Sequence, residues 1–383
     1  MAKSTSERYY SSKNIRKLKA VYNVIYGKRS KGKTYDMLYN ILSDYWAARK
    51  KGELCQAIYL RRWDTDIKQV NMSTVCDTLL CNGEGVNVVE QLTEGQYNSV
   101  RYWQKQWYLS KVDPESGLVN KDAQPFMIAQ ALNTWSHSKG SAYPYVKCIW
   151  FEEFIAVATD RYLSGEFTAF ANFVSTVVRK RTDVTIWMTG NNVDMYCPYF
   201  EEMGLTRITS QEQGTIDTYK LGRSGKVIAV ERTKDSGQWK DSEINNDYYF
   251  AFSNPELKMI TSGDWEIGMY PLQSDDVAPR DICGRFFILF KTERMQCDIV
   301  SSAGAAYIYV HKDMDPLDPM DEDYDLIYTT EVCIKPNYRR SFNYGMTDAE
   351  HTIRQLINMG KVLYDSNVTG NAFEAYIKHS RGI

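Results

Sequence analysis

The stretch Ala20-Val-Tyr-Asn-Val-Ile-Tyr26, followed by Gly27-Lys-Arg-Ser-Lys-Gly32-Lys33-Thr34, decides the fold. The first seven residues form an apolar run typical of a β-strand, and the next eight match the pattern G-x-x-x-x-G-K-[ST] in full. Apolar residues then recur at helical spacing between Thr34 and Lys50 (Met37, Leu38, Ile41, Leu42 and Trp46). A strand, a glycine-containing loop and a helix in this order predict a phosphate-binding loop, with a chance match as the alternative.

The spacing of this loop suits a nucleotide phosphate. Glycines allow backbone N–H groups to turn inward at a helix N-terminus, where the helix dipole favours negative charge. Lys33 would bridge the β- and γ-phosphates, and the Thr34 hydroxyl would ligate Mg²⁺. The expected cofactors are therefore ATP and Mg²⁺, and the loop residues expected to contact the nucleotide are Gly27, Arg29, Ser30, Lys31, Gly32, Lys33 and Thr34.

An acidic strand end is the second feature of a candidate active site. Cys148-Ile-Trp-Phe-Glu152-Glu153 carries two carboxylates to the end of an apolar run, and ligands bind at the carboxyl ends of strands in parallel sheets. We expect Glu152 to reach the Mg²⁺ shell through water, although Asp is the usual residue there. Glu153 would polarise the attacking water as general base. Two solvated glutamates after a strand are the alternative.

Strands and helices alternate along the first half of the chain. Strands are predicted at Ala57–Leu60, Val146–Phe151 and Val184–Met188, and helices at Thr65–Leu80 and Phe167–Arg181. Aromatic runs at Val100–Leu109 and Phe126–Leu132 flank a turn and predict an antiparallel insertion. This order favours a mainly parallel sheet flanked by helices, in an α/β domain over residues 1–205.

The pattern of predicted elements changes after residue 205. Short strands at Ile216–Lys220 and Lys226–Glu231 and a charged stretch after them predict a small β-rich linker domain over residues 206–265. A third α/β domain is expected over residues 266–383, ending in a helix with the capping box Thr347-x-x-Glu350. Its strand Arg285–Phe290 carries no carboxylate. The acids of Asp313–Asp325 indicate a solvated loop, although a metal cluster that includes Asp298 stays open.

Composition excludes several classes of protein. The 383 residues are 43% hydrophobic with a formal charge of −2, and mean hydropathy is −0.46, so we expect no membrane span. Eight cysteines without a CxxC pair, and four histidines, argue against a zinc site or a disulfide framework and favour reduced intracellular thiols. The polar first twelve residues predict neither a signal peptide nor lipidation. Nucleic acid would have to be bound through a local patch or through many copies.

Six motifs occur in an order that resembles a known family: Gly27–Thr34, Tyr59-Leu-Arg-Arg62, Trp135-x-x-x-Lys139-x-x-x-Tyr143-Pro144, Phe151-Glu-Glu-Phe154, Val178-Arg-Lys-Arg181 and Asn192-x-x-x-x-x-Pro198-Tyr-Phe200. Together they resemble the DNA-packaging ATPases of phi29-like phages, which are relatives of the terminase large subunits. The resemblance covers about residues 9–205 and is faint beyond them.

The resemblance implies a homomeric ring, usually a pentamer, that pumps double-stranded DNA through the portal of an empty capsid using ATP. Such a protein acts in the host cytoplasm and transiently at the portal vertex, and a structural packaging RNA is a further expected partner. The resemblance assigns a trans-acting arginine to Arg179, a trans-acting lysine to Lys139 and a P-loop arginine to Arg29, and it places a motif at Thr189-Gly190-Asn191. It also implies an ASCE-type ATPase domain and a degenerate RNase H-like nuclease domain without cutting activity.

Several assignments have alternatives in the sequence itself. Arg179 could instead be an ordinary charged helix end, with Arg181 as the substitute finger. Arg61 and Arg62 could line the nucleotide pocket or form structural ion pairs, and Asn191 could sense the γ-phosphate or belong to a plain turn. At the level of function, a P-loop helicase or remodeller and a non-catalytic nucleotide-gated adaptor are the alternatives. Candidate DNA contacts are Lys68, Arg223 and Lys226, and candidate docking residues are Lys335, Arg339, Arg340, Lys378 and Arg381.

Overall fold

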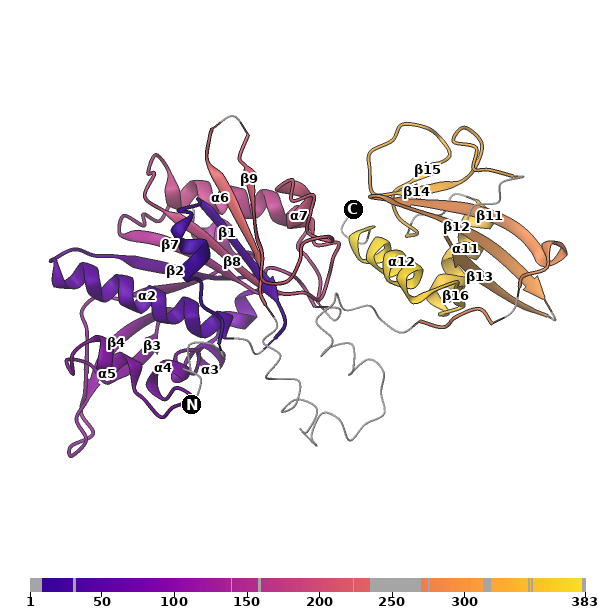
Figure 1. Ribbon diagram of the computed structural model, residues 1–383. Coiled ribbons are helices and arrows are strands. Elements are labelled where there is room, and N and C mark those ends of the chain that lie inside the picture. The colour runs from indigo at the N-terminus through magenta and orange to yellow at the C-terminus, as the bar shows by residue number, and fades with distance from the viewer. Residues whose placement is uncertain are drawn as a thin grey trace, which may run out of the picture. The chain divides into compact units, whose positions relative to one another are not determined.

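The computed structural model describes residues 9–29, 32–138, 140–157, 160–222, 224–234, 270–274, 276–302, 304–312, 318–343, 345 and 347–380. The chain divides into two units, Met1–Ala251 and Phe252–Ile383, and each is described by itself (Figure 1).

The first unit is built on a ten-stranded sheet in the order β3-β4-β6-β2-β7-β8-β1-β10-β9, with β5 paired to β4. Strands β6, β2, β7, β8, β1 and β10 run parallel, and the remaining strands are antiparallel to their neighbours. The bounds are β1 Tyr22–Gly27, β2 Gln56–Arg61, β3 Ser99–Trp103, β4 Gln106–Val112, β5 Val119–Lys121, β6 Met127–Ala131, β7 Val146–Glu152, β8 Thr185–Asn191, β9 Ile216–Lys220 and β10 Val227–Arg232.

The register of the central strands brings distant sequence segments to one edge. β8 lies between β1 and β7, so that Gly27 is opposite Asn191 and Glu152 is opposite Thr189. The loop after β1 and the acidic end of β7 therefore share the carboxyl edge of the sheet, where ligands bind in such folds.

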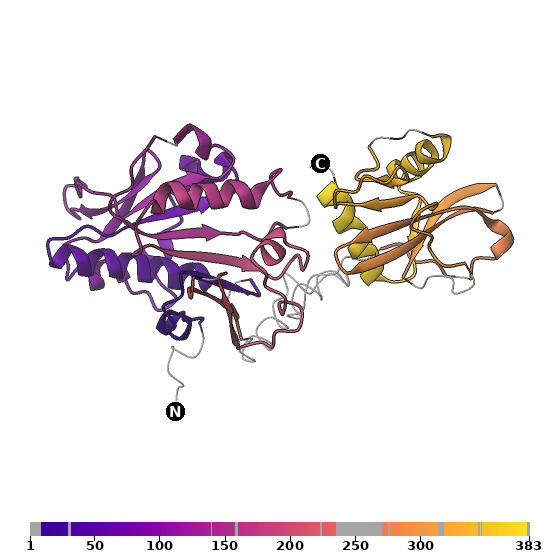
Figure 2. The ribbon, with the colours of Figure 1, turned by 90° about the horizontal axis from the view of Figure 1, so that it is seen from above.

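Two long helices cover opposite faces of this sheet (Figure 2). Residues of α2 (Lys33–Lys50), among them Met37 and Leu38, share a buried cluster with Trp150. The next residue, Phe151, points to the other face, where its ring centroid lies 5.5 Å from that of Phe170 in α6 (Glu166–Val178). The other helices are α1 Lys13–Lys17, η2 Asp64–Ile67, α3 Gln69–Met72, α4 Asp77–Leu80, α5 Val88–Leu92, η3 Trp135–Ser138 and α7 Pro198–Glu202. The prediction of a mixed α/β fold with a large, mainly parallel sheet is confirmed.

One element prediction in the first unit was wrong in detail, and another was confirmed. The stretch 65–80 is not one helix but the short pieces η2, α3 and α4, with Lys68 extended between the first two (φ −65°, ψ 153°). Its Asp, Thr, Asn and Ser residues are weak helix formers, and the side chains of Asn71, Ser73 and Thr74 donate to local backbone carbonyls. The antiparallel insertion predicted from Val100–Leu109 and Phe126–Leu132 is confirmed. β3 and β4 form a hairpin that turns at Gln104 and Lys105 with φ of 51° and 61°, and β4 pairs antiparallel with β6.

The strands predicted for the linker domain lie in the first sheet. β10 pairs in parallel with β1, and β9 pairs with β10. The physical reason is that β1 would otherwise be an open edge, and the buried Ile228, Ala229 and Val230 of β10 extend the core over it. Residues 206–234 thus differ from the separate module that we expected, and residues 235–265 lie outside the described part of the chain.

The second unit contains a six-stranded sheet in the order β15-β14-β11-β12-β13-β16. β11, β12 and β13 form an antiparallel meander, while β14 runs parallel to β11 and β16 parallel to β13. The bounds are η4 Pro279–Asp281, β11 Ile282–Phe290, β12 Glu293–Ser302, β13 Ala305–His311, β14 Ile327–Thr329, β15 Tyr338–Arg339, α11 Asp348–Asn358, β16 Val362–Tyr364 and α12 Asn367–Ser380. The capping box predicted at Thr347 and Glu350 is confirmed at the start of α11.

Across the described residues, the structure contains no helix with the length and apolar character needed to cross a membrane.

Candidate functional site

The loop between β1 and α2 requires glycine at both of its ends. A Cβ on Gly27 would lie 1.9 Å from the Thr233 hydroxyl oxygen, because the chain after β10 returns directly beside the loop. Gly32 has φ 87° and is the N-cap of α2, a conformation that favours glycine. Arg29 is exposed on the loop, whereas Ser30 and Lys31 lie outside the described residues.

The Lys33 ammonium lies at the centre of this loop. It is buried, and its Nζ donates to the Gly27 carbonyl at 3.0 Å, to the Lys28 carbonyl and to Asn191 Oδ1 at 3.3 Å. Asn191 ends β8, so the contact follows from the register that sets it opposite Gly27. The fold thus brings together Lys33 and Asn191, which were predicted from separate motifs.

Thr34 meets Glu152 across the carboxyl edge of the sheet. The Thr34 hydroxyl donates to Glu152 Oε1 at 2.6 Å. The other carboxylate oxygen accepts from the Tyr59 hydroxyl and from Arg61 Nη1 at 3.2 Å. A hydroxyl and a carboxylate are oxygen ligands of the kind that Mg²⁺ prefers, and Thr34 directly follows Lys33 in the sequence. The donor set therefore fits a Mg²⁺–nucleotide complex.

Glu153 occupies an unusual turn directly after β7. Its φ is 55°, and 53% of its side chain is exposed. Its Oε2 accepts from Arg61 Nη2 at 2.5 Å. A cavity of about 30 Å³ adjoins Glu153, Arg61 and Asp66, which exceeds the roughly 10–15 Å³ that a cavity needs to hold one water molecule. A carboxylate beside such a cavity can accept a proton from a water held there.

The structure separates the roles of Arg61 and Arg62. Arg61 contacts Glu152, Glu153 and, at 3.6 Å, Asp66. Burial lowers its pKa, but the nearby Tyr59, Glu153 and Glu152 raise it more, so the guanidinium stays charged. Arg62 points to the other side, where its Nε donates to Glu166 Oε2 at 2.8 Å. Both arginines form ion pairs, but Arg61 alone of the two reaches the acidic carboxylates of the β7 end.

Arg179 and Arg181 follow α6 at the opposite edge of the sheet. Arg179 is exposed, and its Nη2 donates to the Ser141 carbonyl at 3.4 Å, shortly before β7 begins. Arg181 binds the carbonyls of Val146 at 2.8 Å and Val177 at 2.7 Å, so it fixes the local backbone. Of the two, Arg179 has the freer side chain, and neither contacts the loop of its own chain in these interactions. Lys139 lies outside the described residues.

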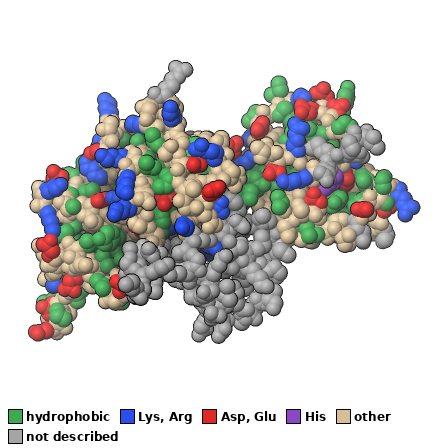
Figure 3. All heavy atoms as spheres, viewed as in Figure 1, with side chains coloured by type: hydrophobic (Ala, Val, Ile, Leu, Met, Phe, Trp, Pro, Cys, Tyr) green, Lys and Arg blue, Asp and Glu red, His purple; other side chains and the backbone are tan. Residues whose placement is uncertain are grey.

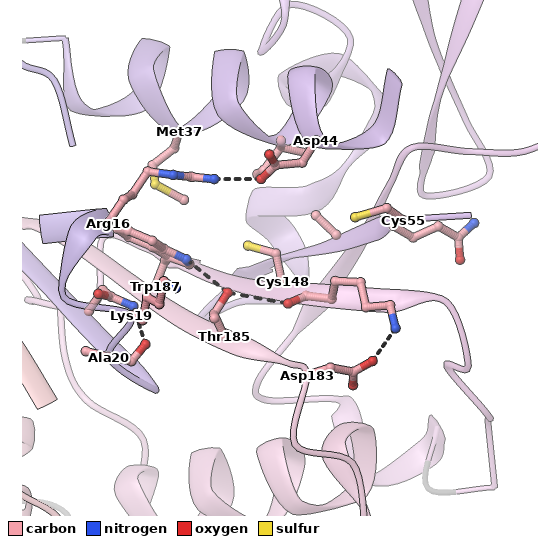
Figure 4. Close-up of a pocket in the computed structure, with 15 residues that line it drawn as sticks. Arg16, Lys19, Ala20, Met37, Asp44, Cys55, Cys148, Asp183, Thr185 and Trp187 are labelled. Carbon is pink, nitrogen blue, oxygen red and sulfur yellow. Dashed lines mark hydrogen bonds and ion pairs between the residues drawn. The ribbon is translucent and has the colours of Figure 1, made fainter. Parts of the chain in front are cut away.

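A second cavity, of about 320 Å³, lies at the amino ends of β1, β2, β7 and β8 (Figure 4). Met37, Ile41 and Trp187 line it, and the ion pairs Arg16–Asp44 and Lys147–Asp183 border it. Burial raises the pKa of the Cys55 thiol to about 11 and that of Cys148 further, so neither is a reactive thiolate at neutral pH. This cavity is at the opposite edge from the loop and does not belong to the phosphate site.

In the second unit, a guanidinium lies between two carboxylates. Arg285 Nε is 3.0 Å from Asp298 Oδ1, and Arg285 Nη1 is 2.9 Å from Asp318 Oδ2. Asp298 also contacts His311 and Gln296, and although burial opposes it, these hydrogen bonds lower the pKa of its carboxyl group. Within the described residues, no group of three or more His, Cys, Asp or Glu side chains could hold a metal ion. The predicted loop acids Asp313 and Asp315 lie outside them.

Some of the basic side chains suggested for docking or DNA binding are ion-paired, and others are exposed. Lys335 pairs with Asp323 and Arg339 with Glu350, so their charge is neutralised locally. Lys68 and Lys226 are exposed, and Arg223 and Arg381 are outside the described residues. On the face that Figure 3 shows, Lys and Arg side chains of the first unit are spread among acidic and hydrophobic ones.

Sequence reasoning missed two residues of this site. Tyr59, which the sequence offers only as part of a motif without a role, contacts Glu152, and Glu166, which no motif contains, binds Arg62. Tyr59 and Arg61 are two residues apart along β2, and this spacing is a signal in the sequence that both side chains point to one face of the sheet. Glu166 had no comparable signal, because its pairing depends on where α6 begins.

The strand order and the glycine-bounded loop between β1 and α2 define an α/β fold of the P-loop type. The family model of the Podovirus DNA encapsidation protein (Gp16) matches residues 118–215. The DNA packaging protein of Bacillus phage B103 is 27% identical over 186 residues, which are 48% of this chain and 48% of that protein. The DNA packaging protein of Bacillus phage phi29 is 25% identical over 199 residues, 50% of this chain and 49% of that protein. The match spans about half the length of these curated relatives.

A solved structure of the bacteriophage phi29 viral genome packaging motor assembly is similar in fold. Its chain has a TM-score of 0.50 and 19% identity, and the alignment covers 97% of this chain and 99% of that chain. Along the matched half, the chain is a homologue of the DNA packaging proteins of phi29-like phages.

Proposed function

We propose that this chain is an ATP-hydrolysing motor subunit that moves double-stranded viral DNA into a preformed capsid through its portal. The contact of Thr34 with Glu152, 2.6 Å long and adjacent to the buried Lys33, carries the ATPase part of the proposal. The likeness to phage DNA packaging proteins supports DNA as the cargo. A homomeric ring, usually of five subunits, and a packaging RNA as a further partner remain part of this proposal.

Each residue of the site has a role in the proposed reaction. Loop N–H groups from Gly27 to Gly32, with Arg29, hold phosphate oxygens, and Lys33 neutralises charge between the β- and γ-phosphates. Thr34, and Glu152 through water, would hold Mg²⁺, which when bound would withdraw charge from the phosphate oxygens. Glu153 accepts the proton of the attacking water, and Asn191, beside Lys33, senses the γ-phosphate.

We assign the first unit as an ASCE-type ATPase domain and the second as a nuclease-like domain without cutting activity. The position of β8 between β1 and β7 supports the first assignment. The order β13-β12-β11-β14-β15, with its antiparallel meander and parallel additions, supports the last. The Arg285 cation between Asp298 and Asp318 disfavours a metal there, because it already supplies the compensating charge.

Replacement of Lys33 by Ala tests the nucleotide site. We expect the variant to lose steady-state ATP hydrolysis, because the charge between the β- and γ-phosphates is gone. Exposed Lys50 at the far end of the same helix, replaced by Ala, is the control and should leave turnover unchanged. Turnover near the wild-type rate in Lys33→Ala would refute the nucleotide assignment.

Two other outcomes would favour the alternative functions. ATP hydrolysis by the wild type without DNA translocation would favour a remodeller, and DNA packaging that survives Glu153→Gln would favour a non-catalytic adaptor.

A further inference from the structure

Glu153 has a backbone conformation that its own side chain does not favour. Its φ of 55° lies in the left-handed region, where residues other than glycine are uncommon. Such a conformation persists only where the surrounding structure enforces it, and it is concentrated at functional sites. The turn after β7 must therefore be held by specific contacts.

Arg62 supplies these contacts from the neighbouring strand. Its Nη1 donates to the Glu153 carbonyl at 3.3 Å, and its Nη2 donates to the Phe154 carbonyl at 2.6 Å. The Phe154 N–H in turn donates to the Thr189 carbonyl of β8 at 3.3 Å. One planar guanidinium thus fixes two successive carbonyls of the turn that carries the Glu153 side chain.

Arg62 is itself held rigidly. Arg62 and Glu166 are each 3% exposed. The Arg62 Nε donates to Glu166 Oε2 at 2.8 Å and to Glu166 Oε1 at 3.1 Å. The Glu166 carboxylate further accepts from the Tyr199 hydroxyl at 2.9 Å and from the Leu163 N–H at 2.7 Å. Arg62 also lies 5.0 Å from the ring centroid of Tyr162. A buried charge with this many partners has a single orientation.

We infer that Arg62, oriented by Glu166, is a positioning residue that holds the Glu153 turn in the geometry needed to activate water. The inference rests on the proposed function, in which Glu153 is the general base. It differs from the role of Arg61, whose guanidinium contacts the carboxylates themselves. Arg62 touches the backbone of the base and acts on the reaction through it.

The first test replaces Arg62 by Lys in the full-length chain. Lysine keeps the charge that Glu166 needs but lacks the planar fork that reaches both carbonyls. We expect kcat for ATP hydrolysis to fall by about 10- to 100-fold, because small displacements of a catalytic group have effects of this order. The KM for ATP should stay within about twofold, since Lys33 and Thr34 are untouched.

A double variant separates positioning from stability. Arg62→Met with Glu166→Gln removes both charges together, so no buried charge is left without its partner, and the glutamine oxygen can still accept from Tyr199. Thermal unfolding should show a folded protein with a midpoint near that of the wild type, whereas kcat should remain low. Arg49→Lys, at the Arg49–Asp122 pair elsewhere in the unit, is the matched control and should leave kcat unchanged.

The outcomes distinguish this inference from the proposed function. A wild-type chain that does not hydrolyse ATP would overturn both. Wild-type hydrolysis together with normal kcat in either stable Arg62 variant would overturn the positioning role alone. A parallel rise in KM and fall in unfolding temperature, with kcat retained, would show that the pair is only structural.

Discussion

Two adjacent carboxylates, Glu152 and Glu153, have different surroundings although they follow the same strand. Glu152 is the last residue of β7 and contacts the Thr34 hydroxyl, Tyr59 and Arg61. Glu153 turns away with φ 55° and is bound at its carboxylate by Arg61. This difference follows from the alternation of side chains along a strand and from the break in the strand after Glu152.

The surroundings predict different effects of the same substitution. Glu153→Gln should lower kcat by about 100-fold or more while ATP remains bound, because the amide cannot accept a proton. Glu152→Gln should instead raise the Mg²⁺ concentration needed for half-maximal activity, because one ligand charge is lost. A filter assay for retained ATP and a Mg²⁺ titration of turnover measure the two effects. Exchanged phenotypes would mean that the two roles are reversed.

At the residue scale, sequence reasoning identified the groups but not their contacts. The P-loop pattern and the pair Glu152–Glu153 were visible because each is contiguous in sequence. The contact of Lys33 with Asn191 depends on β8 lying next to β1, which periodicity cannot supply. The roles of Arg61 and Arg62 also stay open in the sequence. Alternation puts the two side chains on opposite sides, but it does not indicate which side faces the phosphate loop.

At the element scale, β10 was predicted as a strand but assigned to the wrong structural context. Its parallel pairing with β1 brings Glu231 opposite Ile25, close to α2. The Tyr10 hydroxyl donates to Glu231 Oε2 at 2.7 Å. Burial raises the pKa of Glu231 to about 7; the hydrogen bond from Tyr10 lowers it, and the nearby charge of Asp36 raises it. A pattern-based prediction finds such a strand but not the long-range pairing that partly buries Glu231.

This partly buried carboxyl makes the stability of the first unit depend on pH. The folded pKa of Glu231 is above its unfolded value, so the folded state binds more protons, and stability falls as pH rises from about 4.5 through 7. Between pH 5.5 and 7.5 we expect the wild type to lose about 1–2 kcal/mol relative to Glu231→Gln. Urea unfolding at the two pH values measures this difference. Glu53→Gln, at an exposed position, is the control. If the free energy of unfolding changes equally with pH in the wild type and in Glu231→Gln, the expectation is contradicted.

At the scale of the whole molecule, α6 connects the acidic end of β7 with the opposite edge of the sheet. Glu166 starts the helix beside Arg62, and Arg179 follows its last residue, thirteen positions later and about 20 Å along the helix axis. Arg179 contacts Ser141 near the start of β7 rather than the loop of its own chain. Folding it back onto its own γ-phosphate would require the helix to be reversed. We therefore propose that Arg179 serves the nucleotide site of a neighbouring subunit, as in the arrangement that the resemblance implies.

A mixing experiment tests whether the active site is shared in this way. Lys33→Ala subunits still present Arg179, and Arg179→Ala subunits still bind ATP, so each alone should be inactive. In a head-to-tail ring made from equal amounts of the two proteins, about a quarter of the sites would combine an intact loop with an intact arginine. The rate of ATP hydrolysis should therefore return to about a quarter of the wild-type rate. Lys180→Ala, an exposed cation at the same helix end, should be active alone. If the two inactive proteins assemble together, as judged by mass, but hydrolyse no ATP, then Arg179 acts within its own subunit or only in structure, because a shared site would necessarily have been formed.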